Sequence, residues 1–192
     1  DDTDAAERVK IQYGTSMCYP VSSMGSHVSV VPNHQLNRKT PLHTRANVAY
    51  FGTFGYELDL NKLSDEEISE VKQQITFMKE YRELIQFGTF YRLKSPFEGN
   101  ETAWMTVSED KKTALVFWYR ERNVVNADFT RVRLQGLDPD LIYRNEYNET
   151  ENYGDELMNL GLLTTDCTAG EPTSEDEPCT DYESRIYVLT AK

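Results

Sequence analysis

Three carboxylates open the sequence, at Asp1, Asp2 and Asp4, and they are of a type that could support acid–base chemistry. An aspartic acid with a suitable pKa can give a proton to a leaving group and later take one from water. The same residues also suit the start of a helix, where carboxylates cap free backbone amides and interact well with the helix dipole. Taken alone, the capping role is the more common one, so the choice depends on what surrounds the three residues.

Histidines and serines offer weaker alternatives. His27, His34 and His43 are spaced too widely for a compact metal motif, which favours packing or loop roles over metal binding. Serines lie close to His27, but no GxSxG elbow surrounds them, so a serine-hydrolase site is not indicated. We therefore expect no metal and no serine nucleophile.

Large aromatic residues gather at Trp104 and at 117–119. They could form a platform on which a sugar stacks, but at alternating strand positions such residues more often belong to a core. The cysteines, Cys18, Cys167 and Cys179, are odd in number and lack metal-ligand spacing. We expect reduced thiols in a cytoplasm, and a Cys167–Cys179 bridge stays an open alternative.

Composition narrows the class of protein. The 192 residues are 39% hydrophobic and 27% charged, which is ordinary for a folded globular chain. Acidic residues outnumber basic ones 32 to 20, and the formal charge of −12 repels nucleic acid and anionic membrane surfaces. No apolar run is long enough to predict a membrane span. Because the chain does not begin with Met, we expect a processed or excised piece of a longer protein.

The first half alternates helix and strand. Helical spacing runs from Thr3 to Tyr13, and a buried strand is expected over 22–29. A helix follows Pro41, and the segment FGTFGYELDL then predicts a strand. Ser64 and Glu67 form a capping box for a helix that reaches Gln86. This alternation is typical of α/β architecture.

From Gly88 the hydrophobic period changes to two residues, with turn signals between the runs TAWMTVS, ALVFWYR and TRVRLQG. We expect antiparallel strands, closed by a last strand in SRIYVLTA. The acidic stretch over 164–181 has no periodicity and predicts an exposed loop. The sequence therefore predicts two domains, 1–87 and 88–192, with an α/β fold followed by an all-β fold.

Long motifs make the sequence resemble family 36 of the glycoside hydrolases, the bacterial-type α-galactosidases. They are DDTDAAERVKIQYGTSMCYPVSSMGSHVS, PNHQLNRKTPLHTRANVAYFGTFGYELDL and FYRLKSPFEGNETAWMTVSEDKKTALVFWYR. The resemblance covers nearly the whole chain, apart from TTDCTAGEPTSEDEPCTDY, which looks like an insertion. It implies that 1–87 are the last part of a catalytic (β/α)8 TIM barrel and 88–192 a C-terminal antiparallel β-sandwich.

The resemblance also implies a reaction. In the family, the first aspartate of the run seen here as DDTDA is the general acid/base, which places that role on Asp1 and leaves Asp2 and Asp4 to start the helix. The family nucleophile, also an aspartate, has no counterpart in these residues. The expected activity is hydrolysis, with retention, of terminal α-galactosyl residues from raffinose- and melibiose-type oligosaccharides, without metal or organic cofactor. Family members are commonly tetramers, so we expect a homo-oligomer, and we expect the isolated chain to be inactive.

Two rival interpretations stay open. Residues 88–192 could be a non-catalytic β module that binds carbohydrate or braces a barrel. The chain could also belong to a related galactosyl transferase or α-N-acetylgalactosaminidase, and only residues upstream of Asp1 would decide between hydrolysis and transfer.

Overall fold

The computed structural model describes residues 2–124, 128–164 and 181–192. Contacts divide the chain into two compact units, Asp1–Gly88 (unit 1) and Thr89–Lys192 (unit 2). The assignment of 1–87 and 88–192 to two domains of a larger enzyme stays a prediction. Within the described ranges, no helix is both long and apolar enough to cross a membrane.

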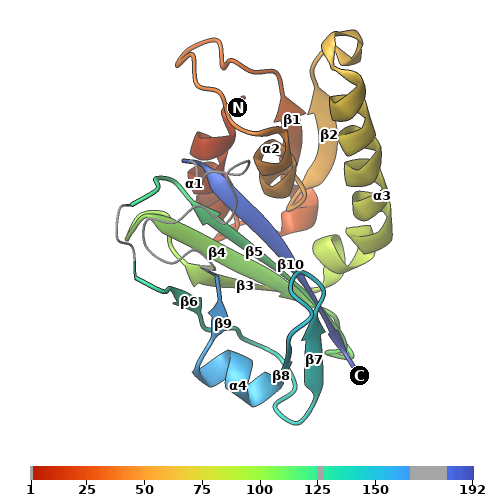
Figure 1. Ribbon diagram of the computed structural model, residues 1–192, viewed down its shortest axis with the longest axis vertical. Coiled ribbons are helices and arrows are strands. Elements are labelled where there is room, and N and C mark those ends of the chain that lie inside the picture. The colour runs from red at the N-terminus through yellow and green to blue at the C-terminus, as the bar shows by residue number, and fades with distance from the viewer. Residues whose placement is uncertain (1, 125–127, 165–180) are drawn as a thin grey trace. The chain divides into compact units, whose positions relative to one another are not determined.

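Unit 1 alternates helices with two strands, as the sequence predicts (Figure 1). Its elements are α1 (Ala5–Thr15), η1 (Val21–Ser23), β1 (Gly25–Ser29), α2 (Leu42–Ala49), β2 (Thr53–Glu57), η2 (Leu60–Lys62) and α3 (Asp65–Phe87).

The strands β1 and β2 are parallel neighbours joined through α2, which is a βαβ unit. Gly25 pairs with Thr53, and Ser29 pairs with Glu57. Gly52 enters β2 where there is no room for a side chain, because a Cβ there would lie 2.4 Å from Ser26 Cβ. Both strands therefore end at the same edge, which is where enzymes built from repeated βα units carry their catalytic loops.

Buried polar side chains connect the elements of unit 1. Arg8 of α1 donates to Gly25 O at 3.0 Å and to His27 O at 3.3 Å. Gln12 of α1 donates to Val48 O at 2.9 Å and to Phe51 O at 3.2 Å. The two Gln12 bonds are buried away from water, so each satisfies a carbonyl that would otherwise be costly to bury.

The last helix of unit 1 begins at the predicted cap. Ser64 accepts a hydrogen bond from Glu67 N at 3.2 Å, and Glu67 Oε2 accepts one from Ser64 N at 2.9 Å. This reciprocal pair satisfies two amides that have no partner inside the helix. The capping box of α3 is therefore confirmed.

Unit 2 is built around one six-stranded sheet in the order β3-β4-β5-β10-β7-β8, all of whose pairs are antiparallel. A two-stranded sheet of β6 and β9 accompanies it. The elements are β3 (Thr89–Lys94), β4 (Glu101–Val107), β5 (Thr113–Arg120), β6 (Arg131–Val132), β7 (Ile142–Asn145), β8 (Glu151–Tyr153), α4 (Gly154–Asn159), β9 (Leu162–Leu163) and β10 (Glu183–Ala191).

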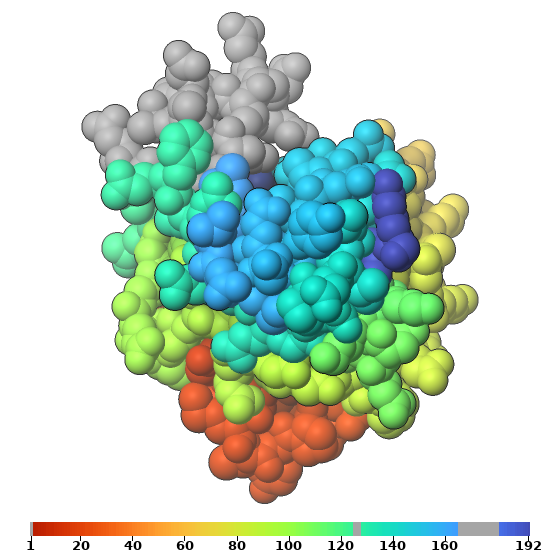
Figure 2. All heavy atoms as spheres, turned by 90° about the horizontal axis from the view of Figure 1, so that it is seen from below, coloured from red at the N-terminus to blue at the C-terminus, as the bar shows by residue number. Residues whose placement is uncertain are grey.

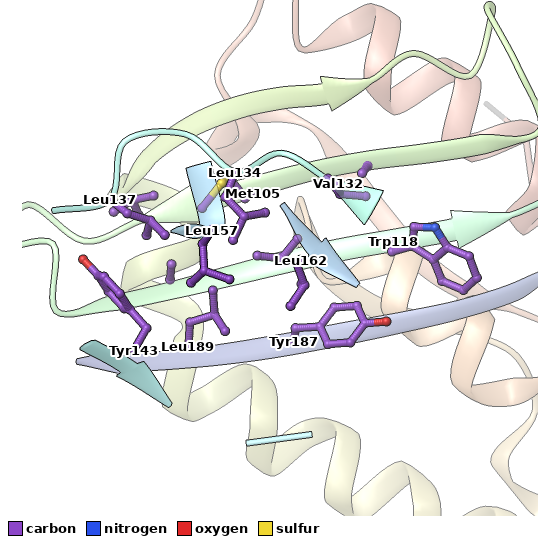
Figure 3. Close-up of a cluster of buried hydrophobic side chains, with 14 residues drawn as sticks. Met105, Trp118, Val132, Leu134, Leu137, Tyr143, Leu157, Leu162, Tyr187 and Leu189 are labelled. Carbon is purple, nitrogen blue, oxygen red and sulfur yellow. The ribbon is translucent and has the colours of Figure 1, made fainter. Parts of the chain in front are cut away.

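A buried apolar cluster joins the large sheet to a smaller second layer (Figure 3). Met105, Trp118 and Leu189 come from the sheet, while Leu157 of α4 and Leu162 of β9 come from the second layer. The segments of this layer lie side by side in the space-filling view (Figure 2), in agreement with the pairing of β6 with β9. The predicted fold class, α/β followed by antiparallel β, is confirmed.

Three details of unit 2 differ from the sequence expectation. The run TRVRLQG forms only the two residues of β6, because Leu134 N then donates to Leu157 O of α4 at 3.1 Å. The helix α4 was not expected, since its six residues are too short to show a helical period. The strands β4 and β5 are buried at all positions except their first, not at alternate ones.

Candidate active site

The first described residues form the start of α1. Asp4 has an extended conformation, and its carboxylate accepts a hydrogen bond from Glu7 N at 3.3 Å. Asp4 N in turn donates to Asp2 Oδ1 at 2.8 Å. The expected role of Asp2 and Asp4 as helix-start residues is thereby confirmed. Asp1, the candidate acid/base, lies outside the described residues.

The loop that follows β1 contacts this segment (Figure 1, in orange at the top). Asn33 Nδ2 donates to Thr3 Oγ1 at 3.0 Å, and Arg38 forms an ion pair with the carboxylate of Asp4. The loop begins at the carboxyl end of a parallel strand, so the start of α1 is held at that edge of unit 1. Residues next in sequence to the candidate acid are therefore placed where βα-repeat enzymes carry catalytic groups.

Two opposing influences act on the buried carboxyl of Asp4. Asp4 is only 3% exposed, and burial raises the pKa of its carboxyl, while the Arg38 guanidinium and Glu7 N oppose that rise. A buried carboxylate needs such partners to stay ionised. Arg38 also approaches Glu7 Oε1 at 3.7 Å. The cation thus lies between two carboxylates at the start of one helix.

His27 of β1 lies 2.5 Å from Glu57 of β2, measured from Nε2 to Oε2. Burial and the nearby Arg8 guanidinium lower the pKa of His27, and they outweigh Glu57, which favours the charged form. His27 therefore pairs with a neighbouring strand, which is the packing role that the sequence favoured. Within the described ranges, no group of three or more His, Cys, Asp or Glu side chains could hold a metal ion.

The serine alternative finds no support in unit 1. Ser26 Oγ donates to Ala49 O, and Ser23 Oγ donates to Pro20 O at 2.8 Å. Neither hydroxyl is directed at a histidine base, which a serine nucleophile requires. Both hydroxyls instead donate to backbone carbonyls.

The aromatic residues of unit 2 belong to the core, as the sequence analysis favoured. Trp104, Phe117, Trp118 and Tyr119 are all at most 2% exposed. Trp104 and Phe117 stack on each other with ring centroids 4.3 Å apart. A sugar cannot stack on rings that are covered in this way, so they do not form a binding platform.

A hollow of about 440 Å³ lies between β2 and α3. Its lining includes Lys79 and Arg82 but no carboxylic acid. It therefore cannot supply either of the two carboxyls that a glycosidase needs. Cys18 is exposed, while Cys167 and Cys179, with most of the acidic stretch, lie outside the described residues.

Comparison with known proteins decides the family. The model of the Melibiase family matches residues 1–88, and the model of the glycosyl hydrolase family 36 C-terminal domain matches residues 101–189. The chain belongs to glycoside hydrolase family 36.

Relatives of this family 36 chain are α-galactosidases. AgaA of Geobacillus stearothermophilus is 54% identical over 162 residues, which are 84% of this chain and 22% of the relative. Alpha-galactosidase 1 of Pediococcus pentosaceus is 47% identical over 191 residues, which are 100% of this chain and 25% of the relative. The family 36 chain thus spans about a quarter of the length of these relatives.

Solved structures of α-galactosidases are also similar to this chain. The crystal structure of AgaA superposes with a TM-score of 0.91 at 48% identity, covering 100% of this chain and 25% of AgaA. A variant of AgaA solved in complex with raffinose superposes with a TM-score of 0.90 at 47% identity, covering 99% of this chain and 25% of the variant. The family 36 chain therefore has the fold of the C-terminal portion of these enzymes, the end of a TIM barrel followed by a β domain.

Sequence reasoning did not assign roles to Asn33 and Arg38. Both lie in the quoted motif PNHQLNRKT, directly after a predicted strand. A loop at the carboxyl end of a barrel strand was the available signal, but their contacts with Thr3 and Asp4 span about thirty positions and only the fold reveals them.

Proposed function

We propose that this chain is the C-terminal part of a retaining α-galactosidase and that Asp1 is its general acid/base. The observation that carries the proposal is the anchoring of residues 2–4 at the carboxyl end of β1 through Asn33 and Arg38. The names of the relatives support the activity, and the AgaA variants solved with raffinose and stachyose support oligosaccharides as substrates.

The proposed reaction needs two carboxyls about 5 Å apart, one on each side of the glycosidic bond. In the first step, the nucleophile carboxylate attacks the anomeric carbon while Asp1 protonates the departing oxygen. In the second step, Asp1 takes a proton from the water that releases galactose. The nucleophile would come from residues outside this chain, so the chain alone would be inactive.

A chimera tests this proposal, with residues 1–192 in place of the matching quarter of AgaA. Asp1→Ala in the chimera should lower kcat/KM for raffinose by about 10²- to 10⁴-fold, the usual contribution of a general acid. The same change should affect p-nitrophenyl α-galactoside far less, because nitrophenolate leaves without a proton. Azide should restore turnover of the nitrophenyl substrate, since it attacks the galactosyl-enzyme without needing a base.

Glu109→Ala is the matched control, because it removes an exposed carboxylate from unit 2. It should leave both substrates unaffected. An equal loss for both substrates in Asp1→Ala would overturn the acid/base role. Should the chimera not fold, the corresponding exchange in AgaA itself gives the same comparison.

The rival β-module interpretation is tested by calorimetry of galactose with residues 88–192. A binding module would give saturable heat, whereas the enzyme proposal expects none. The position of Trp118 inside the core cluster of unit 2 supports the second outcome. Tetrameric assembly, cytoplasmic location and the choice of hydrolysis over transfer stay predictions.

A further inference from the structure

Two separate contacts hold the segment that precedes α1, and both come from one short loop. Asn33 donates to the side chain of Thr3, and Arg38 pairs with the side chain of Asp4. Asn33 is 4% exposed and Asp4 is 3% exposed, while the Arg38 side chain is 22% exposed, so the contacts are partly shielded from water. Shielded hydrogen bonds to charged groups are stronger and more directional than exposed ones.

The loop itself is closed by its own hydrogen bonds. Asn33 N donates to Arg38 O at 2.8 Å, and Asn37 N donates to Asn33 O at 2.8 Å. Asn33 Oδ1 also accepts from Gln35 N and Leu36 N, each at 3.0 Å. Asn33 and Arg38 are thereby fixed relative to each other.

Helix capping alone does not require this arrangement. Asp4 already satisfies the amide of Glu7 as an ordinary N-cap, which is what a helix start needs. The Arg38 ion pair and the Asn33 hydrogen bond are additional, and both act on residues N-terminal to the helix. Their effect is to fix the backbone of residues 2–4, which is directly bonded to residue 1.

We propose that Arg38, supported by Asn33, is a positioning residue for proton transfer by Asp1. It holds Asp4, and Asp4 N holds Asp2 through the 2.8 Å bond to Asp2 Oδ1. Consecutive Cα atoms are about 3.8 Å apart, so fixing Asp2 limits where the carboxyl of the preceding residue, Asp1, can reach. Proton transfer requires the Asp1 carboxyl to lie within hydrogen-bond reach of the glycosidic oxygen. Small displacements of the carboxyl lower the rate of proton transfer steeply. This inference rests on the proposed acid/base role of Asp1.

The test uses the AgaA chimera and compares Arg38→Gln with Lys39→Gln. Lys39 is exposed and adjacent in sequence, so its exchange removes the same charge without touching Asp4. Arg38→Gln should lower kcat for raffinose by about tenfold to a hundredfold, the scale expected for a misplaced catalytic group. KM should change little, p-nitrophenyl α-galactoside should be affected by less than about threefold, and Lys39→Gln should match the parent chimera on both substrates.

Two further variants keep the test decisive. Arg38→Lys keeps the charge and should restore part of the raffinose turnover, and Asn33→Ala should show the Arg38→Gln pattern more weakly. A purely structural role predicts something different, namely a lowered thermal midpoint with equal losses on both substrates. That result in the folded variants would overturn the positioning role.

The outcome separates this inference from the proposed function. If Asp1→Ala discriminates between the two substrates and Arg38→Gln does not, Asp1 remains the acid and only the positioning role fails. If Asp1→Ala does not discriminate, the acid/base assignment itself fails.

Discussion

The interior of unit 1 and the interior of unit 2 contain different kinds of buried side chain. Among the described residues, nine of the twelve largest fully buried side chains lie in unit 2, and only Val9, Phe51 and Ile85 lie in unit 1. Unit 1 instead buries long polar side chains, Arg8, Gln12 and Arg45, which reach backbone carbonyls of neighbouring elements. The unit that carries the candidate site therefore adds directional bonds from long polar side chains to its apolar burial, whereas the other unit holds most of the largest buried side chains.

This difference has a physical consequence for each unit. Apolar burial is roughly proportional to area and tolerates small shifts. Hydrogen bonds to buried carbonyls weaken steeply with distance and angle, and so they define positions.

The largest expected effect is in the apolar core cluster of unit 2. Trp118→Ala should lower the free energy of unfolding of unit 2 by about 3–5 kcal/mol, because it empties a fully buried position in the core cluster. Both tryptophans lie in unit 2, so the emission of Trp104 in a urea titration reports on that unit alone. Phe129→Ala, at a position 63% exposed, should change the free energy by well under about 1 kcal/mol. Similar losses for the two variants would contradict a core role for Trp118.

The contribution of buried polar side chains to unit 1 is tested by Gln12→Ala. Removing the amide leaves Val48 O and Phe51 O without their bonds, and we expect a loss of about 2–3 kcal/mol. The far-ultraviolet helical signal monitors unit 1, which contains the three longest helices. Gln73→Ala, on an exposed position of α3, is the matched control and should be nearly silent. If Gln12→Ala were also silent, the directional bonds would not be what holds unit 1 together.

A smaller effect is expected at the cap of α3. Ser64→Ala removes one half of the capping box and should cost about 1 kcal/mol of stability, read from the same helical signal. Ser69→Ala, an exposed position inside the same helix, should be neutral or slightly stabilising, because alanine is the better helix former. Equal losses in the two variants would mean that the cap does not contribute.

The smallest effect is a pH dependence confined to unit 1. Because burial and Arg8 lower the pKa of His27 below its ordinary 6.5, the unfolded chain binds the proton more tightly than the folded chain. The contribution of His27 to stability is therefore present above pH 6.5 and is lost as pH falls through the lower folded pKa. His27→Gln should flatten this slope in the helical signal. The same slope in tryptophan emission would show that the titrating group lies in unit 2.

The sequence predicted much of the fold because its local signals were strong. The capping box at Ser64 and the helical spacing behind it placed α3, and the helix start at Asp4 placed α1. The short elements β9 and α4 escaped prediction, since two to six residues carry no usable period, and β6 is shorter than the run TRVRLQG that predicted it. At the candidate site, Asp1 came from resemblance to a family, whereas Arg38 and Asn33 depend on a loop closing onto a distant segment, which no local pattern encodes.

The position of β10 sets an order of events during synthesis. Residues 183–191 are the last of the six strands to leave the ribosome, yet they lie between β5 and β7 in the sheet. Until they arrive, β3–β5 and β7–β8 have no hydrogen bonds to each other, and each group has an open edge that other chains could pair with. A nascent chain that stalls before residue 183 would therefore be prone to aggregate, and a chaperone would have most to shield at that moment.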